Sequence, residues 1–245
     1  MTKPDYIVSD IHLGAVPDAT ERAFIRFLDH VGSDAAALLI AGDLFDFWFE
    51  YGDVVPGRHF RTLAAIARLV DAGMTVTMAG GNHDAWGGRF LREEVGLTFH
   101  TEPFVMQLGG RRALIAHGDG LGRGDFKYRA LKTVIRSRVA VGAFRALHPE
   151  LGMRLAAAVS NTEGKGHSAD AAADRAAFLD RWAAEQLRGD ATLDYVVCGH
   201  AHIPLVREVE PARYYLNAGD WITHFTYIVA AADGPSLRTW RDASA

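Results

Sequence analysis

The sequence predicts one α/β domain, and three observations support this fold class. Short apolar runs alternate along the 245-residue chain with longer segments in which apolar residues recur at helical spacing. Hydrophobic residues make up 49% of the chain, which is enough to bury a substantial core. Five of the apolar runs are followed at once by Asp, Asn or His residues, at the position where open α/β sheets bind their ligands.

The first eighty residues alternate strand and helix. A continuous apolar run that ends in a tight polar turn is typical of a buried strand. Three such runs are expected to be strands: residues 6–10, 37–43 and 74–80. Between them, residues 19–31 place apolar side chains on one helical face, and residues 59–73 form an amphipathic helix whose end is marked by Gly73.

The rest of the chain predicts a hairpin, a long helix and a group of short strands. Gly109 and Gly110 separate the runs 104–108 and 111–119, which is a hairpin signal. Residues 170–188 are expected to be helical. The remaining apolar runs are expected to be strands: residues 193–200, 205–210, 213–220, 224–231 and 236–240.

Composition limits the classes of function. A net charge of −4 argues against nucleic acid as a partner, because proteins that bind it carry a basic surface. The single cysteine, Cys198, excludes an internal disulfide and fits a reducing compartment. No apolar run reaches the roughly 18–20 residues that span a bilayer, and no secretory signal opens the chain. We therefore expect a cytoplasmic protein.

One basic segment interrupts the α/β pattern. Residues 123–165 hold nine Lys or Arg residues against three acidic ones, a net +6 within a chain whose total is −4. Apolar residues at helical spacing, such as Ile135 and Val139, indicate a helical insertion at about 123–168 within a single domain, 1–245. Two interpretations stay open. The segment is either a solvated basic helix face, or a lid that binds an anionic, partly apolar ligand or rests on an anionic membrane surface.

The polar residues behind the five strands have the side chains of a metal centre. They provide seven candidate ligands: Asp10, His12, Asp43, Asn82, His117, His200 and His202. This set is too large for one tetrahedral ion and suits two ions that share a bridge. Asp43, which follows a glycine, is the expected bridge because a carboxylate can bind one ion through each oxygen. Mixed Asp, His and Asn ligands favour Mn(II), Fe(II) or Zn(II).

In order along the chain, these residues form the motifs D-x-H, G-D-x-x-D, G-N-H-D, H-G-D and G-H-x-H. The set resembles the calcineurin-like metallophosphoesterase superfamily, and the likeness runs from residue 9 to residue 202. The resemblance implies a metal-dependent phosphohydrolase with a four-layered fold, in which two mixed β-sheets pack face to face with helices outside. It also implies one ion on Asp10, His12, Asp43 and His202, and a second ion on Asp43, Asn82, His117 and His200.

His83, in the G-N-H-D motif, resembles a family histidine that is not a metal ligand. The resemblance places it beside the scissile phosphate, where it stabilises charge or protonates the leaving oxygen. A water that bridges the two ions has a lowered pKa and would supply the attacking hydroxide. Either Asp84 or Asp46 can fix the tautomer of His83 by a hydrogen bond, and the sequence leaves both open.

A closer resemblance is to the UDP-2,3-diacylglucosamine pyrophosphohydrolases of lipid A synthesis. The stretches SDIHLG, GDLFDFWFEYG, HGDG, GHAHIP and LNAGDW carry it, together with the basic insertion. It implies cleavage of that lipid-linked nucleotide sugar to UMP and diacylglucosamine 1-phosphate, with manganese as the usual ion. It also implies a helical lid that holds the acyl chains and touches the inner membrane. Seven residues of the insertion would contact the substrate: Asp125, Lys127, Tyr128, Arg129, Asn161, Lys165 and Ser168.

One residue departs from that closer family, whose third motif commonly reads G-N-R-D. The chain has His83 where those proteins have arginine, which clamps phosphate with a fixed charge but cannot act as an acid. The protein is then either a branch with the same substrate, or a metallophosphodiesterase or phosphatase that acts on another nucleotide or sugar phosphate. A non-enzymatic scaffold is disfavoured because no candidate ligand is missing from the motifs.

Overall fold

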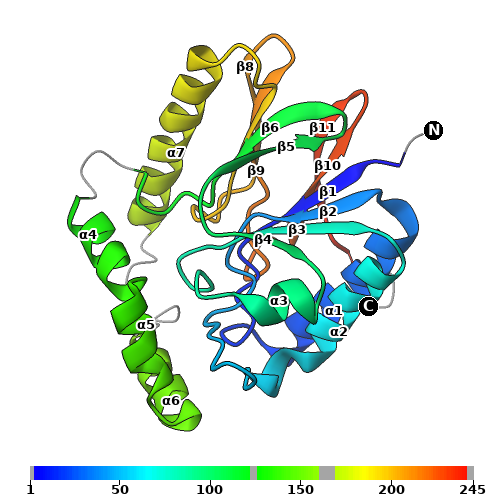
Figure 1. Ribbon diagram of the computed structural model, residues 1–245. Coiled ribbons are helices and arrows are strands. Elements are labelled where there is room, and N and C mark those ends of the chain that lie inside the picture. Colours follow the sequence, from blue (N-terminus) through cyan, green and yellow to red (C-terminus); the bar gives the residue numbers. More distant parts are fainter. Residues whose placement is uncertain (1–2, 122–125, 160–168, 242–245) are drawn as a thin grey trace.

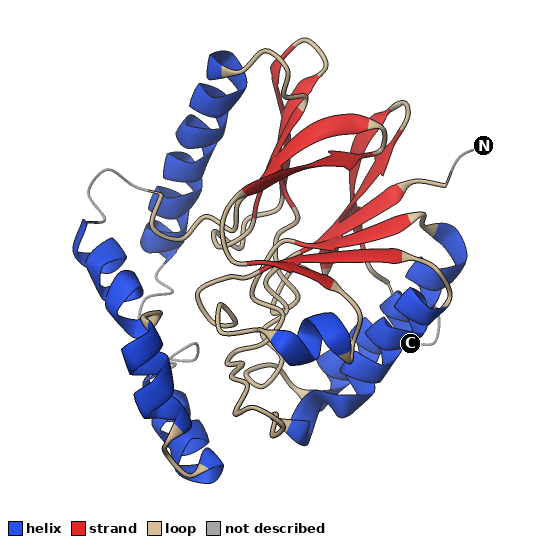
Figure 2. Cartoon of the chain, in the orientation of Figure 1, coloured by secondary structure: helices blue, strands red, loops and turns tan. Residues whose placement is uncertain are grey.

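The computed structural model describes residues 3–121, 126–159 and 169–241. Two mixed β-sheets lie face to face, and helices cover the outer side of each sheet (Figure 1, Figure 2). The four-layered sandwich implied by the motifs is therefore confirmed. None of the helices in the described ranges is long and apolar enough to span a membrane.

The first sheet contains six strands in the order β11-β10-β1-β2-β3-β4. Their bounds are β1 Asp5–Val8, β2 Ala37–Ile40, β3 Thr75–Ala79, β4 Thr98–His100, β10 Thr226–Ala231 and β11 Gly234–Thr239. Strands β1 to β4 are parallel, and β10 and β11 join antiparallel from the end of the chain. The carboxyl ends of β1, β2 and β3 therefore lie at one edge of the sheet.

The second sheet contains five strands in the order β5-β6-β7-β9-β8. Their bounds are β5 Phe104–Leu108, β6 Arg111–Ile115, β7 Tyr195–Cys198, β8 Leu205–Glu210 and β9 Arg213–Asn217. The three central strands, β6, β7 and β9, are parallel, and the two outer strands are antiparallel to their neighbours. The predicted hairpin at Gly109 and Gly110 joins β5 to β6.

Alternating side chains along the strands explain the four layers. The outer helices are α1 (Asp18–Asp34) and α2 (Phe60–Asp71) on the first sheet and α7 (Ala169–Gly189) on the second. Tyr6 and Val8 of β1 pack in the core formed with α1 and α2, whereas Ile7 between them packs between the two sheets. In β7, Cys198 packs with α7 and Val197 packs between the sheets. Each central strand is thus buried on both faces, which explains its unbroken apolar sequence.

Three short elements were not predicted from the sequence. They are a 3₁₀ helix (Gly57–His59), α3 (Arg89–Glu93) and strand β4. Each has only three to five residues, which is too few to show a hydrophobic period. The other predicted strands and helices are present, although several strands end before the polar residues that the sequence grouped with them.

The basic insertion forms three helices, α4 (Phe126–Ile135), α5 (Arg138–Arg145) and α6 (Pro149–Val159). We call these three helices the lid; they form a column beside the sandwich (Figure 1). Ser137 Oγ accepts a hydrogen bond from the Ala140 N–H at 3.2 Å and so caps the start of α5. The cap separates α4 from α5 and leaves Arg136 at the corner between them.

Aromatic rings attach the lid to the sandwich. The ring centroid of Phe144 in α5 lies 4.7 Å from that of Phe49, 5.5 Å from that of Trp86 and 5.9 Å from that of Tyr51. Gly152 of α6 touches the same group, because a Cβ atom at this position would overlap the Tyr51 hydroxyl. The α6 helix can therefore approach the sandwich this closely only with glycine at position 152.

Replacing Gly152 with alanine is expected to push α6 away from Tyr51, because overpacking of this kind costs about 1–3 kcal/mol. Hydrogen–deuterium exchange in α5 and α6 should rise by about tenfold or more. Gly142→Ala in α5 is the matched control, since a Cβ atom there meets nothing within 4 Å. That control should leave exchange unchanged or slow it, because alanine is the better helix former. Equal exchange in the two variants would show that Gly152 does not fix the lid.

Candidate metal centre

Five loops meet at one edge of the sandwich. They follow β1, β2 and β3 of the first sheet and β6 and β7 of the second, and they carry all seven predicted ligands. Within the described residues, the structure gathers six of the seven, together with His83, into three groups of potential ligand atoms. Each group has its atoms within 4.8 Å of one another.

The backbone is strained at this edge. Five predicted ligands have positive φ angles: Asp10 (54°), His12 (51°), Asp43 (51°), His200 (64°) and His202 (60°). Residues other than glycine rarely adopt this left-handed conformation, which costs on the order of 1–3 kcal/mol at each position. Strain of this kind gathers at functional sites, where the surrounding structure holds side chains in one direction.

Glycines allow the loops to come this close. A Cβ atom at Gly42 would overlap the ring of His117, and one at Gly81 would overlap Oδ1 of Asp43. The glycines of the G-D and G-N-H-D motifs are therefore required by space. They bring side chains from three different strands into direct contact.

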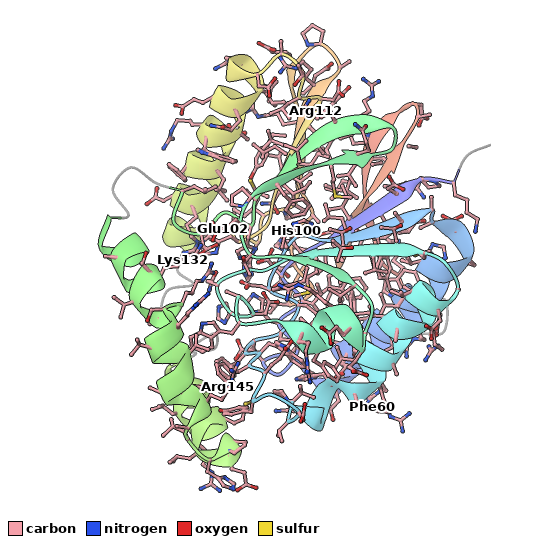
Figure 3. The ribbon with its side chains drawn as sticks, viewed as in Figure 1. Phe60, His100, Glu102, Arg112, Lys132 and Arg145 are labelled. Carbon is pink, nitrogen blue, oxygen red and sulfur yellow. The ribbon has the colours of Figure 1, made fainter. Side chains whose placement is uncertain are left out.

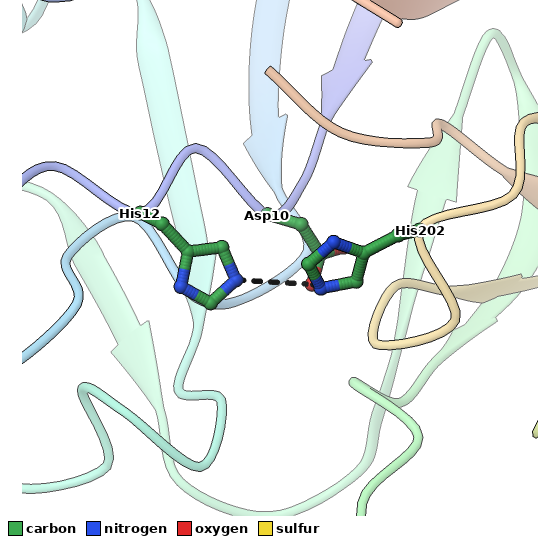
Figure 4. A group of neighbouring side chains, drawn as sticks. All are labelled: Asp10, His12 and His202. Carbon is green, nitrogen blue, oxygen red and sulfur yellow. Dashed lines mark ion pairs between the residues drawn. The ribbon is translucent and has the colours of Figure 1, made fainter. Parts of the chain in front are cut away.

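Asp10, His12 and His202 form the first group (Figure 4). His202 Nε2 lies 3.4 Å from Asp10 Oδ1, and His12 Nε2 lies 3.9 Å from the same oxygen. Asp10 is fully buried, and its carboxylate also accepts the His200 backbone N–H at 3.0 Å. The first group thus joins the loops after β1 and β7.

Asp43, His117 and His200 form the second group. His117 Nε2 lies 3.1 Å from Asp43 Oδ2, while its Nδ1 donates to the carbonyl of Ala41 at 2.9 Å. That bond fixes the ring so that Nε2 faces the centre. His12 Nε2 lies 3.8 Å from the same Asp43 oxygen, so Asp43 stands between the two groups, where a bridging ligand would lie.

Several buried atoms of the centre have no hydrogen-bond partner among the residues described. They are both ring nitrogens of His12 and Oδ1 of Asn82. Leaving such a group unsatisfied costs roughly 1–3 kcal/mol. Divalent cations bind these imidazole nitrogens and amide and carboxylate oxygens, and they offset the buried carboxylates. The residues present therefore fit two divalent ions.

Electrostatic coupling in the second group supports this fit. Burial opposes protonation of His117, but Asp43 and nearby carboxylates outweigh it and hold the pKa of His117 well above its usual value. Burial opposes ionisation of Asp43, but His117 and two other histidines hold the pKa of Asp43 well below its usual range. Burial and the charge of His117 lower the pKa of His200 to about 4. His200 is thus neutral at pH 7, and a cation would take the place of the proton on His117.

His83 lies beside both Asp43 and His12. Its backbone N–H donates to Asp43 Oδ1 at 3.0 Å, and its ring lies edge-on to that of His12 with centroids 4.8 Å apart. The His83 Nδ1 donates to the backbone carbonyl of Asp46 at 2.8 Å, and the Asp46 carboxylate lies 3.7 Å from the same nitrogen. The proton therefore resides on Nδ1, and Asp46 holds it mainly through its main chain. The third group contains His83 with His12 and Asp43, so its geometry also permits a ligand role.

Asp84 holds the loops together. Its fully buried carboxylate accepts the backbone N–H groups of Gly81 and Leu44 at 2.7 Å each, and that of Phe45 at 3.4 Å. Burial and the charge of Asp43 raise the pKa of Asp84 to about 6. Of the two carboxylates that the sequence left open as partners of His83, Asp46 is the one beside the Nδ1 atom, and Asp84 joins the loops after β2 and β3.

Two acidic residues that the sequence analysis did not select lie close to the centre. Asp220 accepts a hydrogen bond from His224 Nδ1 at 2.8 Å and lies 3.8 Å from Nδ1 of His202. Asp119 pairs with Lys132 of the lid, with 2.6 Å between Oδ2 and Nζ. Both follow a strand and a glycine, as Asp43 does, and this shared pattern is the signal by which they could have been found.

The predicted substrate contacts stay predictions. Asp125, Asn161, Lys165 and Ser168 lie outside the described residues. The backbones of Lys127, Tyr128 and Arg129 belong to the first part of α4, and their side chains lie outside the described part of the structure.

Comparisons with known proteins identify a family and relatives of the chain. The family model for calcineurin-like phosphoesterases matches residues 6–204. The chain is 31% identical to UDP-2,3-diacylglucosamine hydrolase from Porphyromonas gingivalis, over 95% of each chain. It is 30% identical to UDP-2,3-diacylglucosamine hydrolase from Escherichia coli, over 94% of this chain and 96% of that one. Among solved structures, the phosphoesterase Yfce from E. coli aligns with a TM-score of 0.46 at 15% identity, covering 96% of this chain and 92% of that one.

The metal content of variants distinguishes the predicted metal ligands from His83. Asp43→Ala should lose both ions because Asp43 stands between the two groups, and His200→Ala should lose one. His83→Ala should keep two ions, as should the control His148→Ala in the loop between α5 and α6. Plasma mass spectrometry of protein dialysed against manganese gives the stoichiometry. An ion lost from His83→Ala alone would make His83 a ligand, as the third group permits.

Proposed function

The chain belongs to the calcineurin-like phosphoesterase family, and on this premise we propose that it hydrolyses UDP-2,3-diacylglucosamine to UMP and diacylglucosamine 1-phosphate. The family match spans residues 6–204 and includes every predicted ligand, so the protein is a metal-dependent phosphoester hydrolase. Two facts support the choice of substrate: the relatives with this hydrolase name align over nearly the whole chain, and the surface beside the metal centre suits an acylated ligand.

The substrate proposal depends chiefly on a cavity between the lid and the candidate metal centre. The cavity has a volume of about 460 Å³ and is bordered by Asn82 and His83. Much of its wall is apolar and comes from both the sandwich and the lid: Phe47, Trp86, Ile135, Phe144, Leu155 and Ala156. Soluble phosphodiesters need no such wall, whereas acyl chains gain roughly 25 cal/mol for each Å² of apolar surface removed from water.

A second cavity carries more charged side chains. It measures about 700 Å³, borders His117, and is lined by Lys132, Arg136 and Arg138 of the lid. Lys132 projects from the lid toward the sandwich, on the side where Glu102 lies (Figure 3). Arg136 borders both cavities, so the two meet at this residue. We assign the cavity with these three cations to the nucleotide half of the substrate and the cavity with the aromatic wall to the acyl chains.

The two metal sites are proposed as the motifs imply. One ion would bind Asp10, His12, Asp43 and His202, and the other would bind Asp43, Asn82, His117 and His200. When bound, the ions polarise the phosphate and lower the pKa of a water molecule that they hold. We propose manganese, with iron and zinc as the alternatives that the same ligands accept.

The protein itself supplies orientation and a proton. The Asp46 carbonyl holds the Nδ1 proton of His83, so Nε2 is the nitrogen through which His83 would protonate the leaving oxygen. Asp84 keeps the loop of His83 against the loop of Asp43 through buried hydrogen bonds. The fixed loops hold these groups in place before substrate binds, which reduces the reorganisation needed in the transition state.

Phosphorus NMR tests the proposed reaction. Purified protein with manganese is expected to convert UDP-2,3-diacylglucosamine to UMP and the lipid 1-phosphate, and His83→Ala should slow this by about 10²–10⁴-fold. Bis(p-nitrophenyl) phosphate serves as a generic diester beside it. Turnover of the generic diester alone would contradict the proposed substrate and favour a metallophosphodiesterase or phosphatase acting on another nucleotide or sugar phosphate.

We also propose that the lid rests on the cytoplasmic surface of the inner membrane. The lid exposes apolar side chains to solvent: Val139 is 83% exposed, Val134 62% and Leu151 56%. Exposed cations lie on the same helices, including Arg138 and Arg154. Apolar side chains with neighbouring cations are typical of helices that lie at an anionic membrane surface.

Vesicle sedimentation tests the membrane contact. Val139→Asp combined with Leu151→Asp should weaken binding to vesicles containing phosphatidylglycerol by about tenfold or more, since each side chain loses its burial in lipid. Phe60→Asp is the control, because Phe60 is 69% exposed but lies on α2, away from the lid (Figure 3). Unchanged binding of the double variant, or equal loss in the control, would contradict a contact through the lid.

A further inference from the structure

We propose that Arg136 of the lid binds a phosphate oxygen of the substrate and supplies the fixed positive charge that His83 does not. The proposal rests on the proposed function in one respect, namely that a phosphate binds at the candidate metal centre. It adds to that function a residue of the lid that takes part directly in substrate binding. None of the motifs in the sandwich contains this residue.

The guanidinium of Arg136 reaches the loop that carries Asn82 and His83. Its Nη2 donates to the carbonyl of Gly81 at 3.3 Å. Gly81 immediately precedes Asn82, and a Cβ atom at Gly81 would overlap the carboxylate of Asp43. The charge of Arg136 therefore lies one peptide unit from a predicted metal ligand, although Arg136 is 55 residues away from Gly81 in the sequence.

One nitrogen of this guanidinium is buried without a partner. Arg136 Nη1 is shielded from solvent and has no hydrogen-bond partner among the described residues. No carboxylate of the described chain lies within the 4.0 Å that would make an ion pair with Arg136. A charged donor left in this state costs several kcal/mol unless a ligand binds it. The guanidinium borders both cavities, so an oxygen of a bound phosphate is the partner that the position suits.

Two cations of the lid, in and directly after α4, differ in their partners. Lys132, one helical turn before Arg136, is paired with the buried Asp119, two residues beyond His117. Arg136 comes next, at the corner where α4 ends and Ser137 caps α5. Lys132 thus neutralises an acid of the sandwich, whereas the charge of Arg136 is not matched by any described acid.

His83 and Arg136 would have different roles at the phosphate. The ring of His83 has its Nδ1 engaged by the Asp46 carbonyl, which leaves one nitrogen for a phosphate oxygen. Arginine stays charged at every physiological pH and donates two parallel hydrogen bonds to a phosphate. With Arg136 as the clamp, His83 can serve as the proton donor. The same contact would require the lid to be in place when the phosphates bind.

Binding of inorganic phosphate tests this role without the lipid substrate. Isothermal calorimetry on manganese-loaded protein should show phosphate binding weakened about 10- to 100-fold in Arg136→Gln, and less in Arg136→Lys, which keeps the charge but not the fork. Arg154→Gln removes the same charge from an exposed position of α6 and should bind phosphate as the wild type does. Manganese content and hydrogen exchange of the lid should be unchanged in all three variants.

A second variant separates charge from lid attachment. His83→Arg combined with Arg136→Gln restores a fixed cation beside the phosphate and should regain at least part of the phosphate affinity. Unchanged phosphate binding in Arg136→Gln would overturn the proposal. So would faster hydrogen exchange in the lid of both Arg136→Gln and Arg136→Lys, because the weaker phosphate binding would then follow from a detached lid. If the wild type fails to hydrolyse UDP-2,3-diacylglucosamine while Arg136→Gln still weakens phosphate binding, the substrate proposal fails and the role of Arg136 stands.

Discussion

Five loops pack so tightly around the metal centre that Gly42 and Gly81 have no room for a side chain, and the chemistry of the site depends on this close approach. It brings the carboxylate of Asp43 to 3.1 Å from Nε2 of His117, and both residues are buried. Buried acids and imidazoles at this distance must share protons or bind cations. The left-handed backbone at Asp10 and at four other predicted ligands directs these side chains inward, and the packed layers behind them offset its cost.

The lid contributes charge as well as cover. The sandwich contributes carboxylates to the centre, and the lid contributes cations. Lys132 of α4 pairs with Asp119, and Arg136, directly after α4, donates to the carbonyl of Gly81. Arg136 also borders both the apolar cavity and the cavity lined by Lys132 and Arg138. A ligand with an apolar half and a polar half, joined by phosphates, would therefore bind in one orientation, with its phosphates at the metal centre.

The sequence predicted the parts of the structure that follow from strand periodicity. The candidate ligands follow five parallel strands, so their meeting at one edge was foreseeable once the strands were identified. The partner of His83 was not foreseeable, because the acceptor is the main-chain carbonyl of Asp46 and backbone acceptors leave no mark in a sequence. The lid was expected from its charge, but the break between α4 and α5 depends on the cap at Ser137. Arg136 was expected from the sequence as a cation of the lid, but its contact with Gly81 was not, because that contact depends on where α4 ends.

The residues of the candidate metal centre lie far apart in the sequence, and this separation determines when the centre can form during synthesis. The Asp10 carboxylate accepts the backbone N–H of His200, 190 residues later, and β1 pairs with β10 near the end of the chain. Contacts between such distant segments form slowly and only after both segments have left the ribosome. A nascent chain that stops before His202 thus carries Asp10, His12 and Asp43 without their partners. The proposed metal sites are therefore complete only after the whole sandwich has formed.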